Sequence, residues 1–521
     1  MKDKSINYTT KNTSEVIKSA VDKLVGMVSP TYGPSNNKVI IDKMIYHHVI
    51  DDGVQIARDF ELSDPMENAV LKKIKEVAIK TNDRAGDGTT GSLLVLKGIL
   101  DTSSKTQRKS GREIEIELKY ALQEAKFQLI ANSKTISKTE DIKKVALTSH
   151  DDENTADMIA SLYKDLGKNG VITVDKSPTL ETYFERSDGL KIDSGYISRY
   201  MVADPERNET EMEKPYILIT DYRLTESNDI LPIMNKMVQA GKRNLIVIAE
   251  NVEQNALATL VTNLPQVFNT RNQKAGEFPS VAVAAPKSGD KKQLLEDLAL
   301  MTGAKMFSES KGSNLENVEL NDLGQAGKVI CREDETIIVE PKGAKKDIKK
   351  AISDLESSTK NEKDLKKKEK KQKRLGMIKN SIAVIKVGAY TDVEQKSLKY
   401  KIEDAVYSVR SALKNGVSVG SGLALARIET SSTILNEALK YPHSVLMRNV
   451  GRDDEIISHK TKKDYAINVV TNQTGNFLEV GVVDPTDVLL AGLESAISMA
   501  SILLTSSGIY VETPKEENVK N

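Results

Sequence analysis

The 521-residue chain is poor in the residues that build metal centres, disulfide frameworks and base-stacking surfaces. Its one cysteine, Cys331, excludes an internal disulfide framework and any multi-cysteine zinc site, and is typical of a reducing compartment. The five histidines show no ligand spacing beyond the adjacent pair His47 and His48, which argues against a histidine metal centre. Tryptophan is absent and aromatic residues make up 4% of the chain, so few side chains are present that could stack on nucleic-acid bases.

Net charge and long apolar runs are also missing. The 75 Lys and Arg residues balance 75 Asp and Glu residues, so no overall field favours nucleic acid, an anionic membrane or an acidic substrate. The polar N-terminus, MKDKSINYTTKNTSEVIK, has no signal-peptide core. The most apolar late segment, 495–505, is shorter than the ~20 residues that span a bilayer. We therefore expect a cytoplasmic protein of about three domains, in which 495–505 is a buried helix.

The spacing of apolar residues changes along the chain. Near the N-terminus it predicts amphipathic helices over 14–28, 67–80 and 113–130, with a hairpin between 38 and 53. In the middle, helical patterns at 230–240 and 292–301 separate short β-rich runs, which lie at 216–220, 245–249, 281–285, 328–331 and 336–339. A strand at 383–387, a helix at 402–413 and a mainly helical last hundred residues follow. The pattern predicts a multidomain α and α/β protein.

The segment 360–374, KNEKDLKKKEKKQKR, has nine basic residues in fifteen. Basic patches can bind nucleic acid. The interleaved acids and the helix-forming composition fit a solvated helix better, and we favour that interpretation.

The loop 86–91, GDGTTG, is the sharpest local feature and lies between two predicted helices. Glycines let backbone amides approach a phosphate, the following helix offers unpaired N–H groups, and Thr89 and Thr90 add hydroxyls. Asp87 fits such a loop if it holds Mg²⁺ against phosphate oxygens. The lysine of a Walker A motif is absent, and the pattern fits equally a glycine turn in which Asp or Thr caps the next helix.

Three weaker features lie elsewhere. SPTYGP at 29–34 is a turn that closes the first helix. Asp404 lies beside the apolar stripe of the helix 402–413, where a lone Asp is usually a surface charge, here with Lys401 three residues before it as a partner. Asp484 and Pro485 precede a helix and fit its N-cap and first helical residue. None of the three requires a ligand by itself.

These pieces occur in one order: TYGP, DDGVQIARDFEL, NDRAGDGTT, EDAVYSVRSALKNGVSVGSGLAL and GNFLEVGVVDPTDV. In that order and at these distances they resemble a GroEL-type (group I) chaperonin. The middle segments GVITVDKSPTL, SGYISRYM, AGKRNLIVIAENVEQNALATLV and LNDLGQAGKV extend the resemblance almost end to end.

The resemblance implies three domains. A mostly helical equatorial domain would be formed by 1–133 and 415–521, and a small intermediate domain by 134–188 and 382–414. The central segment, 189–381, would be an α/β apical domain that binds polypeptides.

The resemblance also implies an ATP site. Asp87 would ligate Mg²⁺, with K⁺ as a further candidate ion. Asp404 would orient or deprotonate the attacking water, and Asp52 would lie near the phosphates as a second catalytic residue. Because Asp404 falls in the intermediate domain, hydrolysis would depend on that domain closing over ATP. The residues that would line the pocket or hold the nucleotide are Thr31, Tyr32, Gly33, Pro34, Gly88, Thr89, Thr90, Gly420, Asn468, Val469 and Asp484.

The family's polypeptide-binding surface maps onto eight positions of the central segment: Tyr196, Tyr200, Met201, Leu231, Met234, Leu257, Val261 and Thr262. One buried apolar side chain contributes ~1.5 to 3 kcal/mol, so a single subunit would hold a non-native chain weakly and a ring would multiply the effect. From the residues alone, an ordinary amphipathic-helix core is the preferred interpretation of these positions.

The implied partners are non-native polypeptides, further copies of the chain and a GroES-type co-chaperonin, with no nucleic acid and no membrane. The copies would form a homo-oligomeric ring, seven-membered in the family, as one or two rings.

Several departures mark a divergent member, of the kind that viruses encode. Asp51 stands where the family has Lys before the Asp of its KDG motif, so nucleotide affinity or ion requirement is expected to differ. The pair Asn380-Ser381 replaces two glycines of the lower apical hinge, although Gly189 is kept, so apical motion is expected to be altered.

Other departures concern a glycine-rich turn near the start of the segment 415–521 and the contacts between rings. Ser421 replaces one glycine of a triple-glycine turn, and the helical region after Gly422 is short. Ser444 stands where the family has the arginine of a contact between rings, and Asp453 stands where the family has the acidic partner of that arginine. Because the arginine is missing, the number of rings is left open. An extra stretch at 264–280 enlarges the apical domain, and KEENVKN replaces a flexible Gly-Met tail.

The leading hypothesis is an ATP-driven chaperone that captures non-native polypeptides and encloses them after ATP binding. The alternative is a ring-forming holdase or structural assembly with little ATP turnover. The presence of both Asp87 and Asp404 favours the first. A third hypothesis, a nucleic-acid-associated protein that uses 360–374, predicts salt-sensitive binding to DNA or RNA.

Overall fold

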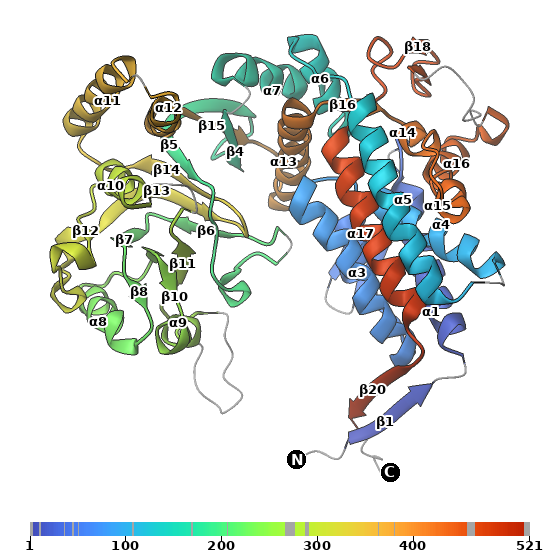
Figure 1. Cartoon of the computed structure of the whole chain (residues 1–521), viewed down its shortest axis with the longest axis horizontal. Helices are drawn as coiled ribbons and strands as arrows, with labels where there is room; N and C mark the ends of the chain where they lie inside the picture. The colour runs from blue at the N-terminus through green and yellow to red at the C-terminus, as the bar shows by residue number, and fades with distance from the viewer. Residues whose placement is uncertain are drawn as a thin grey trace. The chain divides into compact units, whose positions relative to one another are not determined.

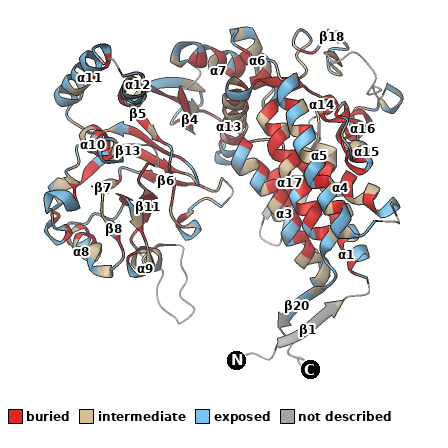
Figure 2. Ribbon diagram, viewed as in Figure 1, coloured by how far each residue is buried: buried red, intermediate tan, exposed pale blue. Residues whose placement is uncertain are grey.

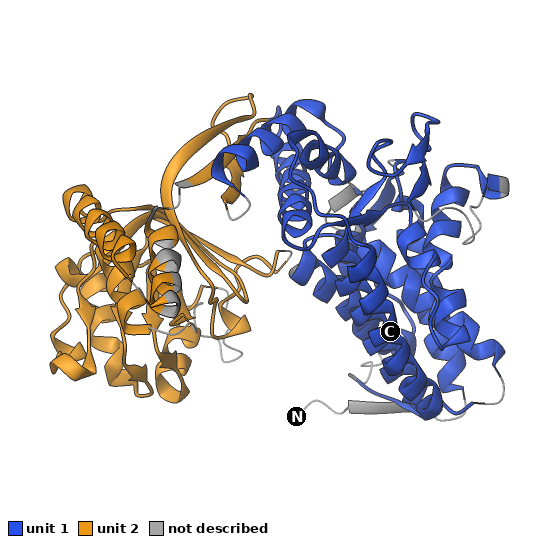
Figure 3. Cartoon of the chain, turned by 45° about the horizontal axis from the view of Figure 1, so that its top comes forward, with its two compact units in different colours: residues 1–168, 389–521 blue, residues 169–388 orange. Residues whose placement is uncertain are grey.

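The computed structural model describes residues 4–9, 12–35, 37–43, 46–50, 52–106, 109–167, 170–205, 207–265, 277–286, 291–362, 364–379, 381–455 and 464–514 (Figure 1). Each part of this chain has its own buried interior (Figure 2). The chain forms two compact units (Figure 3): unit 1 comprises Met1–Lys168 and Ala389–Asn521, and unit 2 comprises Asn169–Gly388. The finer division into three domains stays a prediction.

Four of the departures noted above lie outside the described residues. They are Asp51, Asn380, most of the stretch 264–280 and the tail KEENVKN.

Unit 1 is mainly helical, as predicted for both ends of the chain. Its helices are α1 (Thr13–Val28), α2 (Gly53–Asp59), α3 (Pro65–Ala85), α4 (Thr89–Lys105), α5 (Gly111–Asn132), α6 (Thr139–Ser149), α7 (Glu153–Leu166), α13 (Asp392–Asn415), α14 (Leu423–Ala426), α15 (Thr433–Ala438), α16 (Tyr441–Asn449) and α17 (Thr486–Thr505). Four antiparallel strand pairs join them: β1 (Lys4–Thr9) with β20 (Ile509–Pro514), β2 (Val39–Lys43) with β3 (Tyr46–Ile50), β16 (Val417–Val419) with β19 (Val483–Pro485), and β17 (Tyr465–Ile467) with β18 (Thr474–Asn476).

Local signals explain where the long helices begin and end. Asp64 accepts hydrogen bonds from the amides of Met66 and Glu67 and starts α3, and Gly86 ends it in the left-handed conformation. Ser110 and Glu113 form a capping box at the start of α5.

Helix α17 lies at the centre of unit 1 and packs against α3, α4 and α5 (Figures 1 and 2). It is long and apolar enough to span a membrane by length and composition alone, with a mean hydropathy of 1.8, yet 61% of that window is buried inside the protein. Leu493, Ile497 and Ala500 belong to the core. The predicted buried helix at 495–505 is confirmed and begins earlier, at Thr486.

Unit 2 is an α/β unit built on one large sheet. Its strands are β4 (Val171–Lys176), β5 (Tyr183–Ile192), β6 (Thr210–Glu213), β7 (Tyr216–Thr220), β8 (Arg223–Leu224), β9 (Leu245–Ala249), β10 (Asn251–Val252), β11 (Ser280–Ala284), β12 (Met306–Phe307), β13 (Gly324–Cys331), β14 (Thr336–Pro341) and β15 (Ser381–Val387). Its helices are α8 (Leu231–Gln239), α9 (Gln254–Thr262), α10 (Lys291–Thr302), α11 (Lys345–Lys360) and α12 (Leu365–Lys379).

The sheet order is β11-β9-β7-β13-β14-β5-β15-β4, with β6 paired to β13 and β12 to β7. The strands β7, β9 and β11 are parallel, and β9 is buried along its whole length. Continuous apolar runs such as LIVIA are typical of strands covered on both faces, and the predicted limits of β7 and β9 are correct, while those of β11 are shifted by one residue. The prediction of an α/β middle is confirmed.

The basic segment 360–374 spans the junction of α11 and α12. Lys360, Lys367 and Lys370 are exposed, in agreement with a solvated helical surface. Arg374 instead forms a bidentate ion pair with Asp297 of α10, with both N–O distances at 2.8 Å, and so anchors α12.

One end of the large sheet curls back on itself. Asp175 on the edge strand β4 lies four places from β13 in the strand order, which in a flat sheet would separate them by about 19 Å. Yet Lys328 Nζ of β13 lies 3.1 Å from Asp175 Oδ1. The sheet therefore closes part of a barrel.

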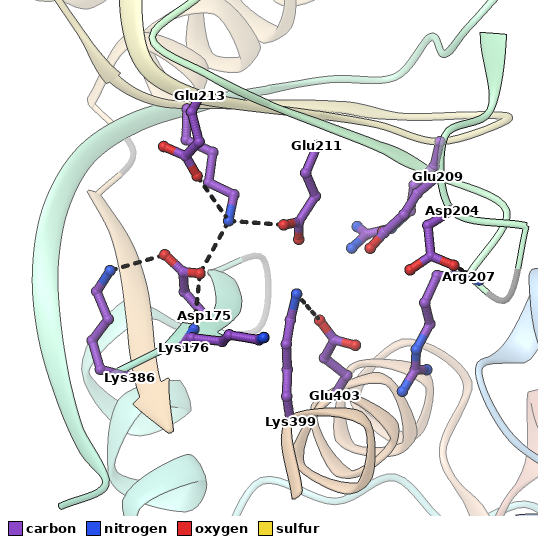
Figure 4. A network of polar contacts seen from close by, with 12 residues as sticks. Asp175, Lys176, Asp204, Arg207, Glu209, Glu211, Glu213, Lys386, Lys399 and Glu403 are labelled. Carbon is purple, nitrogen blue, oxygen red and sulfur yellow. Dashed lines mark hydrogen bonds and ion pairs between the residues drawn. The ribbon is translucent and has the colours of Figure 1, made fainter. Parts of the chain in front are cut away.

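Charged and apolar side chains fill this closure. Lys328 also contacts Glu211 (2.9 Å) and Glu213 (3.4 Å) of β6, and Lys386 of β15 donates to Asp175 Oδ2 (2.9 Å). Figure 4 shows Asp175, Glu211, Glu213 and Lys386 converging on this point. Farther along the same strands, a small separate core contains Val171, Ile330, Ile337, Val339, Ile382 and Val384. The seam between β4 and β13 is thus closed by ion pairs at one end and by apolar packing at the other.

Candidate functional site

The glycine loop 86–91 joins α3 to α4 in unit 1. Gly86 and Gly88 both have positive φ (73° and 86°), and Gly88 is the N-cap of α4 without any side-chain cap. The first amides of α4 therefore have no intrahelical partner and form the positive end of the helix. The alternative in which Asp or Thr caps this helix is wrong, because Asp87 Oδ1 accepts a hydrogen bond from the Gly88 amide instead (2.5 Å).

The Asp87 carboxylate is recessed and held on both oxygens. Ser149, at the end of α6, donates to its Oδ2 atom (3.1 Å), and Ser408 of α13 lies 3.4 Å from the same oxygen. Burial raises the pKa of Asp87 above its ordinary value, against the hydrogen bonds from Gly88, Ser149 and Ser408, which lower it. A carboxylate kept in such a recess is suited to a cation.

Asp484 lies beside this carboxylate in a place that its sequence context did not predict. It is the middle residue of β19 and pairs with Ser418 of β16, while Pro485, without a side-chain cap, precedes α17. Its predicted role as an N-cap is therefore wrong. Burial and the nearby Asp87 raise the pKa of Asp484 to about 7. Burial, Asp484 and Asp87 raise the pKa of Tyr32 as well, so the three groups lie close enough to interact electrostatically, and we call this region the acidic recess.

The donor set of this recess fits a metal bound together with phosphate. The described residues contain no group of three or more His, Cys, Asp or Glu side chains that could hold an ion by themselves. Mg²⁺ is usually held by one or two carboxylates plus substrate phosphate oxygens. Asp87 is the carboxylate that the resemblance assigns to Mg²⁺, and Asp484, which the resemblance assigns to ribose and adenine, is the candidate for a second one. The amides at the start of α4 are candidates for binding the phosphates.

Helix α2 begins next to the same loop. Asp52 caps it by accepting a hydrogen bond from the Val54 amide (2.9 Å). A Cβ atom on Gly53 would lie 2.2 Å from Thr90 Oγ1, so only glycine lets these two helix starts approach so closely. Asp52 therefore lies near Thr90, as the predicted phosphate site requires.

Asp404 lies half-buried on α13, one helical turn before Ser408. Residues four apart share a helix face, and Ser408 on this face contacts Asp87. The same helix packs on the loop, because a Cβ atom on Gly86 would lie 2.4 Å from Tyr407 Cβ. The structure therefore brings Asp404 to the side of α13 that covers the glycine loop.

The turn after α1 carries four of the predicted nucleotide residues. Gly33 has φ of 101° and lies against Leu446, and Pro34 is exposed. Thr31 donates its hydroxyl to Val28 O (2.8 Å), so this side chain closes the helix. The Tyr32 ring lies over Gly91 of α4, since a Cβ atom there would lie 3.7 Å from it.

Asn449, which the sequence did not single out, fixes this turn. Its Nδ2 atom donates to Ser29 O (2.7 Å) and Tyr32 O (2.9 Å). More than 400 residues separate these partners, and no local pattern could have predicted the contact.

The remaining predicted nucleotide residues fall into two groups. Gly420 packs on the backbone of Val483, next to Asp484. Asn468 instead holds its own turn, donating to Val480 O (2.9 Å) and accepting from the amides of Val470 and Thr471. Among the described residues, the hydrogen bonds that the side chain of Asn468 makes stay within the region 468–480, which also contains Val469, and none of them reaches the glycine loop.

The eight predicted polypeptide-binding residues lie in unit 2 but do not form one surface. Tyr196, Met201 and Met234 are core side chains with exposures of 7%, 1% and 5%, which corrects the expectation that they face a bound chain. Tyr200 is 74% exposed and Thr262 is exposed. The remaining three, Leu231, Leu257 and Val261, are half-buried.

A sequence model of the TCP-1/cpn60 chaperonin family matches residues 24–514. The chain belongs to this chaperonin family. Two solved structures of the chaperonin gp146 from the bacteriophage EL 2 (Pseudomonas aeruginosa), both in presence of ATP-BeFx, share the fold of this chaperonin. Crystal form II has a TM-score of 0.68 and 20% identity over 97% of this chain and 98% of that chain. Crystal form I has a TM-score of 0.62 and 20% identity over 97% and 99%. The predicted family and fold class are confirmed, and the low identity agrees with a divergent member.

Gly88 should tolerate no side chain in this chaperonin. A Cβ atom there would lie 2.4 Å from Val488 Cγ1, and the positive φ disfavours any other residue. We expect Gly88→Ala to destabilise unit 1 by about 1–2 kcal/mol, measured as the thermal unfolding midpoint.

Gly376 of α12 is the matched control, because no atom of the described part of the chain lies within 4 Å of a Cβ placed there. Gly376→Ala should leave the midpoint unchanged or raise it. Equal midpoints for Gly88→Ala and the parent protein would contradict this description of the loop.

Proposed function

We propose that this chaperonin is an ATP-dependent folding chaperone that hydrolyses ATP to ADP and phosphate. One arrangement carries the proposal: Asp87 and Asp484 share an acidic recess at the start of α4, under the helix that bears Asp404. Membership of a chaperonin family supports it. The ATP-BeFx present with the phage relative supports nucleotide binding as well.

The residues of the site have separate roles in binding phosphate, binding metal and activating water. The amides at the start of α4 and the hydroxyls of Thr89 and Thr90 hold the phosphates, and Asp87 with Asp484 holds Mg²⁺, with K⁺ as a further candidate. Bound Mg²⁺ neutralises charge on the phosphate oxygens. Asp404 orients or deprotonates the attacking water, and Asp52 fixes the start of α2 beside Thr90.

Further features belong to the same proposal. The protein works in the cytoplasm as a homo-oligomeric ring, captures non-native polypeptides on unit 2 and takes a GroES-type co-chaperonin. The exposed Tyr200 and the half-buried Leu257 and Val261 are the binding residues that the burial pattern favours. A ring holds several weak sites at high effective concentration, which compensates for the few apolar groups exposed on each subunit.

Steady-state ATP hydrolysis by the purified protein, with Mg²⁺ and with EDTA, tests the proposal beside mass photometry of the same sample. We expect turnover that requires Mg²⁺ in a ring-sized particle. A ring without turnover would overturn the ATPase and favour the holdase alternative. A monomer with or without turnover would overturn the ring.

A further inference from the structure

We propose that the hydroxyls of Ser149 and Ser408 are positioning groups for the metal-binding carboxylate of Asp87. This inference deepens the proposed function and rests on it. Neither serine stood out in the sequence, because the two lie 259 residues apart and neither belongs to the glycine loop.

The three side chains form a compact cluster within unit 1. Ser149 Oγ lies 3.1 Å from Asp87 Oδ2 and Ser408 Oγ lies 3.4 Å from the same atom, while the two hydroxyl oxygens are 2.9 Å apart. Ser408 is fully buried and Ser149 is half-buried. A buried hydroxyl needs a hydrogen-bond partner, and here both hydroxyls converge on one carboxylate oxygen.

The donors can be assigned from the distances. Each serine has one O–H group to donate. The shorter contacts give a chain in which Ser408 donates to Ser149 Oγ and Ser149 donates to Asp87 Oδ2. Hydrogen bonds linked in this way polarise one another and strengthen the last bond, the one on the carboxylate.

This chain leaves the carboxylate oriented and still able to bind a cation. An ionised carboxylate has about four lone-pair positions, of which the Gly88 amide takes one on Oδ1 and the serine chain takes one on Oδ2. At least one position on each oxygen stays available for an ion. Partners that orient a metal-binding carboxylate typically change metal affinity by 10–100-fold when they are removed.

The two hydroxyls also come from helices that are separate from the glycine loop. Ser149 ends α6, and Ser408 lies one turn after Asp404 on α13. The metal-binding carboxylate is therefore linked, through the hydroxyl of Ser149, to the helix that carries the proposed catalytic Asp404. Loss of either hydroxyl should lower the affinity for Mg²⁺ and leave the affinity for the nucleotide itself unchanged.

The test compares ADP binding in Mg²⁺ and in EDTA by isothermal titration calorimetry. The dissociation constant in EDTA divided by that in Mg²⁺ measures how much Mg²⁺ strengthens ADP binding, and its measurement needs no turnover. We expect Ser149→Ala and Ser408→Ala each to lower this ratio about tenfold, with the EDTA value within about twofold of the parent protein. The Mg²⁺ concentration for half-maximal ATP hydrolysis should rise by a similar factor.

The controls separate positioning from folding. Ser411 lies three residues after Ser408 on α13, and its buried hydroxyl oxygen has no hydrogen-bond partner among the described residues, so Ser411→Ala should leave the ratio unchanged. Ser149→Thr keeps a hydroxyl and should restore most of the ratio. If the fully buried Ser408→Ala fails to fold, Ser149→Ala carries the test alone.

The outcomes distinguish the two proposals. If Mg²⁺ strengthens ADP binding in the parent protein and both alanine variants keep that ratio, the hydroxyl assignment is overturned and the ATPase proposal stands. If the parent protein shows neither a Mg²⁺ effect nor turnover, both proposals fall. A ratio lowered in the alanine variants and kept in Ser411→Ala supports the assignment.

Discussion

Replacing Asp404 with alanine should lower ATP turnover at least about 100-fold while nucleotide affinity changes by less than about threefold. The half-buried Asp404 lies on the face of α13 that covers the glycine loop, one turn from the serine that contacts Asp87. A group that acts on the attacking water contributes to the transition state and little to ground-state binding, so its loss reduces kcat with little effect on affinity. Steady-state hydrolysis and the binding of a fluorescent ATP analogue measure the two quantities.

Asp392 supplies the matched control for this change. It is an exposed Asp in the first turn of the same helix, so Asp392→Ala should keep turnover within about twofold. Asp404→Asn guards against a folding defect, because it keeps the side-chain volume and should lose turnover equally. Turnover within fivefold of the parent protein in both Asp404 variants would remove this residue from the catalytic site.

Replacing Lys328 with methionine should destabilise the curled sheet of unit 2 by about 2–3 kcal/mol. The side chain is 10% exposed and contacts three carboxylates, those of Asp175, Glu211 and Glu213. Methionine keeps the packing of the side-chain stem but leaves buried negative charge without its main partner. Full burial would cost 3–5 kcal/mol, and the partial exposure of the carboxylates reduces that value. Amide hydrogen exchange of β4 and β15 measures this local loss of stability, with exchange of β9 as the internal reference.

The same network predicts a pH dependence with a definite sign. The ammonium groups of Lys328 and Lys386 lower the pKa of Asp175 to about 2 from its ordinary 3.8, although burial acts in the opposite direction. The stabilisation, on the order of 2 kcal/mol, is present above pH 3.8 and is lost as the pH falls toward 2. Lys328→Met should therefore unfold at a higher pH on the acid side than the parent protein. Lys350→Met, which removes an exposed lysine of α11, should show neither effect.

The sequence predicted those elements whose limits depend on local chemistry. The strands at 216–220 and 245–249 were predicted with their observed limits, because each apolar run begins directly after Pro215 or Asn244 and is followed by Asp221 or Glu250. Helix α13 begins ten residues before the predicted start, since its first turns are too polar to show an apolar stripe and Thr391 caps them through its side chain. Local patterns therefore predict the existence of a helix better than its ends.

The candidate site was predicted only in part, because contacts far apart in the sequence decide it. Asp484 fits a helix cap by its neighbours, yet its strand pairs with β16 and brings it to Asp87. Met201 and Met234 fit an exposed binding surface by family position, yet both are packed in the core of unit 2. Ser149 and Ser408 belong to one cluster only after α6 and α13 have packed together.

The curled sheet of unit 2 has a mechanical consequence. Its backbone ladders run from β13 through β14, β5 and β15 to β4, and none of them crosses the seam where Lys328 meets Asp175. Separating Lys328 from Asp175 would therefore break no backbone hydrogen bond between the described strands. Because the Lys328 side chain is only 10% exposed, and dissolved ions screen buried ion pairs far less than exposed ones, the ion-paired end of the seam should hold at high salt nearly as well as at low salt.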